Sequence, residues 1–181
     1  GEFQSLRHCF SAGEPLNPEA MRSWKNATGC DVYDGYGQTE TINVIANFPG
    51  MPIKQGSMGK PCPGFDIEII DNEANILETD EIGNIGIKIT NPYPPGLFKG
   101  YYKDQIKTSE VFRNGWYFTG DTATKDKDGY IWFVGRADDI ITSSGYRISP
   151  FEIESTLLEH QHVVEAAVIA KKDYIRGEIV V

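Results

Sequence analysis

The stretch from residue 120 to residue 147 concentrates polar side chains between apolar strand patterns. Asp121 follows a Thr-Gly turn, an Arg-Ala-Asp-Asp run at 136–139 interrupts the next strand pattern, and Gly-Tyr-Arg at 145–147 closes a hairpin. Binding and catalytic groups commonly lie on loops that a rigid scaffold positions. We interpret this stretch as one wall of a nucleotide site with a hinge beside it.

A second polar segment, Asp-Gly-Tyr-Gly-Gln-Thr-Glu at 34–40, runs from a strand pattern into a glycine-rich turn. It is only superficially like the dinucleotide fingerprint G-x-G-x-x-G, because Glu40 stands at the third glycine and no helix pattern follows. The segment offers an aromatic face at Tyr36, a hydroxyl at Thr39 suited to a phosphate oxygen and a carboxylate at Glu40 suited to Mg²⁺. An ordinary β-turn with exposed polar residues is the open alternative.

The composition limits the partners. The formal charge of −9 and the pI near 4.8 argue against a surface for nucleic acid or anionic membranes, and no membrane-spanning run is present. Cys9, Cys30 and Cys62 are far apart and form no C-x-x-C pair, so neither a disulfide framework nor a zinc site is indicated. We expect small-molecule partners and a reducing compartment, namely the cytoplasm or, in an animal, the mitochondrial matrix.

The elements that must position these groups follow three patterns. Residues 6–34 predict strand, helix and strand, with Asn17 as N-cap, Pro18 in the first turn and Gly29 at the end of the helix. Residues 51–135 consist of short apolar runs at 65–70, 85–89, 116–119 and 130–134, divided by Asp, Asn, Gly and Pro. Their spacing predicts a small β-barrel or sandwich.

Two motif-like segments lie in the β region. Ser-Met-Gly-Lys at 57–60 is no phosphate-binding loop, because Pro61 stands where Ser or Thr would bind magnesium. Asp-Lys-Asp-Gly at 126–129 is no calcium loop, because Thr124 and Gly135 stand where carboxylates are needed. Asp-Gly between strand patterns predicts a hairpin turn instead.

The pattern changes after Asp139. Residues 140–141 and 146–148 can pair across a Ser-Ser-Gly turn, Ser149 with Glu152 forms a capping-box pattern before a helix, and 163–170 predicts a strand. We predict an α+β chain with three parts. They are the end of an α/β layer at 1–50, a β-barrel subdomain at 51–137 and the start of a mobile α/β domain at 138–181.

Both ends of the sequence resemble cut sites. Residues 1–3, Gly-Glu-Phe, resemble a cloning remnant, and 178–181 stops within an apolar strand pattern. The chain is therefore expected to be a fragment.

Six segments together resemble the ordered motif set of the adenylate-forming (ANL) superfamily, and within it the acetyl- and medium-chain acyl-CoA synthetases. They are Ser-Ala-Gly-Glu-Pro-Leu at 11–16, Tyr-Gly-Gln-Thr-Glu at 36–40, Tyr-Phe-Thr-Gly-Asp at 117–121, Gly-Arg-Ala-Asp-Asp at 135–139, Gly-Tyr-Arg-Ile at 145–148 and Glu-Ile-Glu at 152–154. The resemblance covers nearly the whole chain, with the motifs in the same order and at matching spacing.

The resemblance implies a nucleotide site in the first and larger part of the chain. Its predicted members are Gly13, Glu14, Pro15, Asp34, Gly35, Tyr36, Gly37, Gln38, Thr39, Asp121 and Arg136. The loop at 13–15 and the Tyr36 ring would enclose adenine, with Asp34 near its amino group. Asp121 would accept hydrogen bonds from both ribose hydroxyls, and Arg136 would add positive charge beside ribose and phosphate.

The resemblance also implies catalytic and conformational roles. Thr39 would hold the α-phosphate and Glu40 the Mg²⁺, and Asp138 matches the hinge about which the C-terminal domain rotates. Residues Gly145, Tyr146 and Arg147 match the segment that serves the CoA-dependent step. Gly37 replaces the tryptophan that shortens the acyl pocket of acetate-restricted members, which favours a medium-chain or branched acid.

The implied reaction converts a carboxylic acid, ATP and CoA to acyl-CoA, AMP and pyrophosphate, with Mg²⁺ as cofactor. The family's phosphate loop and its Gly-Lys segment are not among these 181 residues, so the fragment alone is expected to be inactive. Two alternatives remain open. One is another adenylating enzyme, such as an aryl-CoA ligase or a peptide-synthetase adenylation domain. The other is a non-enzymatic nucleotide-binding remnant in which Asp121 is a turn residue and Arg136 a surface ion-pair partner.

Overall fold

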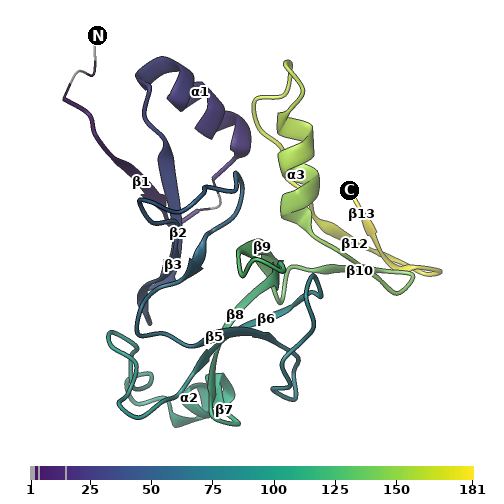
Figure 1. Cartoon of the computed structure of the whole chain (residues 1–181). Coiled ribbons are helices and arrows are strands. Elements are labelled where there is room, and N and C mark those ends of the chain that lie inside the picture. Colours follow the sequence, from purple (N-terminus) through teal and green to yellow (C-terminus); the bar gives the residue numbers. More distant parts are fainter. Residues whose placement is uncertain (1–2, 4, 15) are drawn as a thin grey trace.

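The computed structural model describes residue 3, residues 5–14 and residues 16–181, and it is a mixed α+β structure with three sheets. Figure 1 shows an N-terminal part around α1, a central part built from strands, and a C-terminal part around α3 that projects to one side. Among the described residues, no helix is both long and apolar enough to cross a membrane. The α+β fold predicted from the sequence is confirmed.

The N-terminal part is a four-stranded sheet with one helix. Its elements are β1 (Cys9–Ala12), α1 (Pro18–Thr28), β2 (Val32–Gln38), β3 (Ile42–Ala46) and β4 (Lys60–Pro61). Strands β1 and β2 are parallel, as a strand-helix-strand unit requires, and β2, β3 and β4 pair antiparallel. The Asn17 side chain accepts a hydrogen bond from the Glu19 N–H at 2.8 Å, and Gly29 ends the helix at φ 76°. Both predicted helix ends are confirmed.

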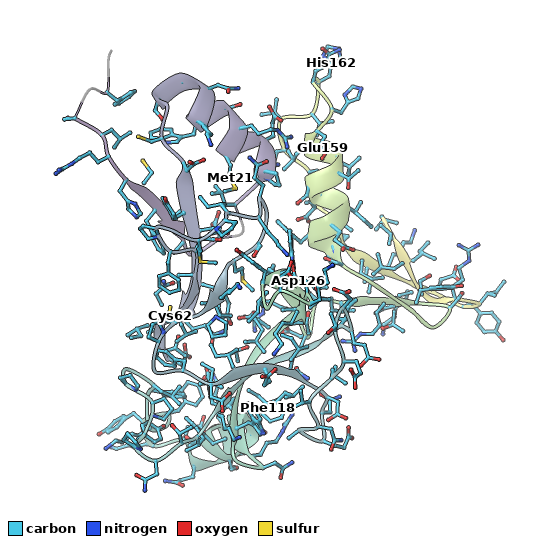
Figure 2. All side chains as sticks on the ribbon, in the orientation of Figure 1. Met21, Cys62, Phe118, Asp126, Glu159 and His162 are labelled. Atoms are coloured by element: carbon cyan, nitrogen blue, oxygen red, sulfur yellow. The ribbon has the colours of Figure 1, made fainter. Side chains whose placement is uncertain are left out.

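The central part is a five-stranded half-barrel that supplies most of the core. Its elements are β5 (Ile67–Ile70), β6 (Gly83–Lys88), α2 (Gln105–Val111), β7 (Phe112–Arg113), β8 (Trp116–Lys125) and β9 (Ile131–Arg136). The strand order is β5-β6-β8-β7, and β9 pairs with β8. Along β8, Tyr117 packs in the main core, whereas Trp116 and Phe118 pack in a second cluster, because neighbouring side chains point to opposite faces. Figure 2 marks Phe118 in this part of the molecule.

Helix α2 and the short strand β7 are elements of the central part that the sequence did not predict. Helix α2 precedes β7 directly. Asp104 caps it by accepting a hydrogen bond from the Lys107 N–H at 2.9 Å. None of its residues is buried, so it carries no apolar stripe from which a period of 3.6 could be read.

The Asp-Gly segment at 126–129 forms the predicted turn between β8 and β9. The Gly129 N–H donates to the Asp126 carbonyl at 2.9 Å, and Lys54 forms ion pairs with Asp126 and Asp128. Figure 2 shows Asp126 near the middle of the molecule, where these strands turn. Its carboxylate therefore serves the hairpin and ties the loop around Lys54 to it.

The C-terminal part is a four-stranded sheet with one helix. Its elements are β10 (Ile141–Ser143), β11 (Tyr146–Ile148), α3 (Pro150–Leu158), β12 (Ala170–Asp173) and β13 (Gly177–Val180). The hairpin and the helix agree with the sequence prediction, and Ser149 caps α3 by accepting from the Glu152 N–H at 3.2 Å. Side-chain contacts join β9 to the segment at the start of α3. Ser149 donates to the Val134 carbonyl, and the rings of Phe133 and Phe151 meet edge to face at 5.9 Å.

The predicted strand at 163–170 is wrong in extent, because β12 begins only at Ala170. Ile169 still pairs with Val181 through backbone bonds of 3.0 and 3.1 Å. Before it, the Val168 N–H donates to the Glu154 carboxylate at 2.8 Å, and Val164 is exposed. The β-branched composition is typical of a strand, but a strand also needs a neighbour, and among the described residues none pairs with 163–168.

Replacing Ile131 with alanine tests the half-barrel core. Ile131 is fully buried, so Ile131→Ala leaves a cavity and is expected to lower the free energy of unfolding by about 2–5 kcal/mol. Ile106→Ala removes the same atoms from a side chain that is 75% exposed and should change it by about 0.5 kcal/mol or less. Urea unfolding measures both, and equal losses would contradict this assignment of the core.

Candidate active site

A pocket of about 300 Å³ opens where the N-terminal and central sheets meet. It is lined by Gly13, Glu14, Asp34, Gly35, Tyr36, Gly37, Gln38, Met58, Asp121, Phe133 and Arg136. All of these except Met58 and Phe133 are residues predicted from the sequence to bind a nucleotide. The volume lies at the lower end of the range for small-molecule sites, about 300–1,000 Å³.

Strand pairing brings the separate motifs together at this pocket. The parallel register places Ala12 beside Gly35, so the loop at 13–14 starts next to the 34–38 segment. The antiparallel register of β8 and β9 places Asp121 opposite Arg136. Hydrogen bonds from Tyr36 and Gln38 to Asp121 join these two pairs, so four stretches of the chain converge at the pocket.

Asp121 is the polar centre of the pocket and is only 6% exposed. Its Oδ2 accepts hydrogen bonds from the Tyr36 hydroxyl at 2.5 Å and from Gln38 Nε2 at 2.6 Å, and neither bond uses Oδ1. Burial raises the pKa of Asp121, whereas the Tyr36 hydrogen bond, the Arg136 charge and the Gln38 hydrogen bond act in the opposite direction. The two donors thus stabilise a carboxylate that burial alone would disfavour.

Asp34 is a second buried carboxylate in the pocket wall, 4% exposed. Burial raises its pKa to about 6, against the backbone hydrogen bonds that it accepts from Gly35, at 2.9 Å, and from Leu16. A partly ionised carboxylate at this place can accept a hydrogen bond from a ligand amino group.

Arg136 lies at the exposed rim of the pocket. Its Nε donates to the Asp138 carboxylate at 3.1 Å, and Asp138, followed by Asp121 and Asp139, raises the pKa of the guanidinium. The predicted hinge residue is therefore in contact with a pocket residue in this conformation.

Thr39 and Glu40 stand in the turn after β2 and do not line the pocket. Thr39 is exposed, and Glu40 Oε1 accepts a hydrogen bond from the Tyr101 hydroxyl at 3.0 Å. The turn is tightened by a bond from the Gln38 N–H to Thr41 Oγ1 at 2.9 Å, and Ile42 follows at φ 115°, which is strained for a β-branched residue.

Glu40 fits a magnesium ion that a nucleotide brings with it. Mg²⁺ usually binds through one or two protein carboxylates together with substrate phosphates and water. Within the described part of the chain, no three His, Cys, Asp or Glu side chains gather as a metal cage. The role of Glu40 as a Mg²⁺ ligand therefore stays a prediction.

Gly37 has a steric role in the sheet that the sequence did not reveal. A Cβ atom here would lie 2.0 Å from the Ile42 carbonyl oxygen and 2.9 Å from the Asn43 Cα. The register of β2 and β3 shifts between Tyr36 and Gly37, and glycine permits this close approach. The role of Gly37 in an acyl pocket stays a prediction. In this structure the β3 backbone occupies the space that a side chain at position 37 would need.

The remaining predicted residues lie elsewhere. Gly145, Tyr146 and Arg147 form the exposed tip and first strand residues of the β10–β11 hairpin, outside the pocket. Gly145 has a φ of 86°, a left-handed conformation that favours glycine. Crowding is not the reason, because a Cβ atom there would meet nothing within 4 Å. Pro15 lies outside the described residues.

Sequence reasoning missed four residues of this site. Met58 belongs to a segment rejected as a phosphate loop and Phe133 to the predicted run at 130–134, yet both line the pocket. Phe133 also packs against the main core. Tyr117 donates to Gln38 and Tyr101 to Glu40. The spacing of Tyr117 and Asp121 along β8 gave no signal, because the strand register shifts between Phe118 and Thr122.

The chain belongs to the AMP-binding enzyme family. The profile of the family described as AMP-binding enzyme matches residues 1–102, and that of the AMP-binding enzyme C-terminal domain matches residues 152–181. Neither profile spans the predicted domain boundary at 137–138, which stays a prediction.

Curated relatives match almost the whole chain. The human acyl-coenzyme A synthetase ACSM3, mitochondrial, is 53% identical over 179 residues, which are 99% of this chain and 30% of that protein. The human acyl-coenzyme A synthetase ACSM5, mitochondrial, is 50% identical, with 99% and 31% covered. The chain thus spans about a third of the length of the relatives that it matches.

Solved structures of adenylating enzymes share the fold. The anthranilate CoA ligase AuaEII, in complex with anthranoyl-AMP, has a TM-score of 0.88 at 38% identity and covers 99% of this chain and 34% of its own. A Brucella canis acyl-CoA synthetase is 46% identical with a TM-score of 0.69, with 98% and 32% covered.

Asp34→Asn tests the buried carboxylate. A folded-state pKa near 6, above the usual 3.8, means that the folded chain binds the proton more tightly, so stability falls as pH rises from about 4 to above 6. The loss is about 3 kcal/mol. Asp34→Asn should therefore raise the free energy of unfolding at pH 8 by up to this amount and have little effect at pH 4.

Asp66→Asn, at a half-exposed site, should show no such difference. Equal effects of Asp34→Asn at both pH values would contradict it.

Proposed function

We propose that the protein containing this chain is an AMP-forming acyl-CoA synthetase. It would convert a carboxylic acid, ATP and CoA to acyl-CoA, AMP and pyrophosphate. The observation that carries the proposal is the pocket in which four separate motifs meet, with the buried Asp121 carboxylate among them. The printed names of its relatives, which are acyl-coenzyme A synthetases, support the same reaction.

The pocket residues suit an adenosine ligand. Tyr36 offers an aromatic face opposite the loop at 13–14, and Asp34 can accept from the adenine amino group. Asp121 would accept hydrogen bonds from the ribose hydroxyls, for which Oδ1 is not engaged by Tyr36 or Gln38. Arg136 at the rim would add positive charge beside the phosphate.

The adenylation step needs charge stabilisation on phosphate oxygens more than acid-base chemistry. Thr39 would donate to the α-phosphate from its exposed position, and Glu40 would hold the magnesium of MgATP. Bound Mg²⁺ would supply neutralisation of phosphate charge. Tyr101 fixes one oxygen of Glu40 and leaves Oε2 for the ion.

The thioester-forming step would use the C-terminal part. Asp138 is proposed as the hinge, and its ion pair with Arg136 would then be one contact that rotation changes. Gly145, Tyr146 and Arg147 are proposed to meet CoA after rotation, and their exposure leaves them free to do so. Such domain movements exchange one set of catalytic contacts for another.

The acid is proposed to be medium-chain or branched, on the resemblance of the motif set to the medium-chain acyl-CoA synthetases. Gly37 gives this proposal no steric support, because the β3 backbone occupies the direction of a side chain at this position. A second candidate is an aryl acid, favoured by the similarity to the anthranilate CoA ligase over 99% of the chain. A peptide-synthetase adenylation domain is a third, because it would share the nucleotide residues.

The word mitochondrial in the names of the relatives favours the mitochondrial matrix over the cytoplasm.

A substrate panel separates these candidates. Purified full-length protein is incubated with MgATP, CoA and acetate, octanoate, isobutyrate, benzoate or an amino acid, and AMP and thioester are measured. We expect the highest kcat/KM with octanoate or isobutyrate and no turnover without Mg²⁺. AMP formed only with benzoate would identify an aryl-CoA ligase. Adenylation of amino acids without CoA thioester would identify a peptide-synthetase domain.

Asp121→Ala tests whether the pocket is a working nucleotide site. It removes the proposed ribose acceptor, so AMP affinity and adenylation by the full-length protein should fall at least about tenfold. Asp66→Ala, at an exposed site, should leave both unchanged. Unchanged AMP binding in Asp121→Ala would favour a non-enzymatic remnant.

The 181-residue chain by itself is expected to form little or no acyl-CoA. It contains neither the family's phosphate loop nor its Gly-Lys segment, which would contribute to adenylation. A coupled AMP-release assay on this chain, with the full-length protein as positive control, measures the difference. Robust acyl-CoA formation by the 181 residues would contradict the roles assigned to the missing segments.

A further inference from the structure

A chain of partly buried hydrogen bonds begins at Tyr117, outside the pocket, and ends at Asp121 inside it. The Tyr117 hydroxyl donates to Gln38 Oε1 at 2.9 Å. Gln38 Nε2 in turn donates to the Thr119 carbonyl at 3.0 Å and to Asp121 Oδ2 at 2.6 Å. Tyr117 and Asp121 lie on β8, whereas Gln38 lies on β2, so the relay crosses from one sheet to the other and back.

We propose that Tyr117 is a positioning residue for the nucleotide site. By holding the Gln38 amide, it fixes the Asp121 carboxylate in the orientation that selects ribose over 2′-deoxyribose nucleotides. This inference rests on the proposed function, in which Asp121 accepts the ribose hydroxyls.

The chemistry of an amide side chain gives Tyr117 this role. An amide has a donor end and an acceptor end. In Gln38 both N–H groups have acceptors, at Thr119 and Asp121, and Tyr117 supplies the donor for the oxygen. Without that hydroxyl, Oε1 would lose its protein donor, and an unpaired buried acceptor is costly. The half-buried Gln38 side chain would then gain by turning towards water, which withdraws its N–H from Asp121.

Asp121 needs this support because it is buried. Of its two side-chain donors, Gln38 is held in turn by the Tyr117 hydroxyl. Hydrogen bonds on Oδ2 restrict rotation of the carboxylate and so determine where Oδ1 points. Loss of one donor would let the carboxylate rotate or protonate, and either change weakens acceptance from a ribose hydroxyl.

The Tyr117 side chain is held firmly by its surroundings, so its hydroxyl can keep the Gln38 amide in one orientation. Its side chain is 1% exposed, and its ring packs against Phe98 at 5.4 Å and Phe112 at 5.1 Å. Tyr117→Phe keeps this packing and removes only the hydroxyl. A matched control is Tyr130→Phe, because Tyr130 is 3% exposed and its hydroxyl donates to the Pro52 carbonyl, outside the pocket.

The test measures the affinity of full-length protein for AMP and for 2′-deoxy-AMP by calorimetry. The wild type should prefer AMP. Tyr117→Phe should weaken AMP binding about tenfold and 2′-deoxy-AMP binding clearly less, because 2′-deoxy-AMP offers Asp121 only its 3′-hydroxyl, so that the preference for AMP narrows. Tyr130→Phe should leave the preference unchanged. Thermal unfolding of each variant confirms that it is folded.

A double-mutant cycle locates the effect at Gln38. Adding Tyr117→Phe to Gln38→Met should cause no further loss of AMP affinity, because the relay is already broken. Equal weakening of both nucleotides by Tyr117→Phe, unchanged AMP binding, or a full additional loss in the Gln38→Met background would each overturn the proposal.

Asp121→Ala separates this inference from the proposed function. If Asp121→Ala abolishes the preference for AMP while Tyr117→Phe retains it, only the positioning role is overturned. If the wild type shows no preference, or if Asp121→Ala retains it, then the ribose role of Asp121 and the inference built on it both fail.

Discussion

The pocket depends on one constraint, which is that the buried Asp121 carboxylate must be surrounded by donors. Removing a carboxylate from water is costly unless hydrogen bonds replace the lost hydration. Asp121 obtains them from Tyr36 and Gln38, which belong to the other sheet. The bonds that keep the carboxylate ionised are therefore also bonds between the N-terminal and central parts. Formation of the pocket and docking of the two sheets are one event.

The apolar core makes this arrangement possible. Val44 and Ile45 of β3 pack in the same cluster as Ile85, Ile87 and Ile131 of the central sheet. Burial of this shared surface stabilises the contact between sheets, since each fully buried aliphatic side chain contributes about 1.5–3 kcal/mol. Apolar burial alone does not fix how the two sheets are oriented. The hydrogen bonds of the polar network do, because they form only in one relative orientation. Gly37 serves the same end by letting β2 and β3 approach where the Tyr-Gly-Gln segment enters the pocket.

The C-terminal part relates to this body differently. Ser149 and Phe151 contact β9, and Arg136 of the pocket rim holds Asp138. These contacts are few, and the ion pair is exposed, so it contributes at most about 1 kcal/mol. Loose attachment beside a rigid pocket suits a domain that changes position between two half-reactions, as proposed for the synthetase.

The sequence by itself determined the local features and the family. Asn17, Pro18 and Gly29 mark a helix because capping depends on nearby residues, and the motif order identifies the nucleotide segments. Tertiary structure alone decided the features that need a partner from elsewhere. Residues 163–168 have strand composition, but within the described part of the chain no strand pairs with them. Gly37 is required by the backbone of β3, and Phe133 belongs to the pocket wall. The Tyr117–Gln38–Asp121 relay joins residues more than 75 positions apart, and hydrogen bonds of that kind arise only when the sheets dock.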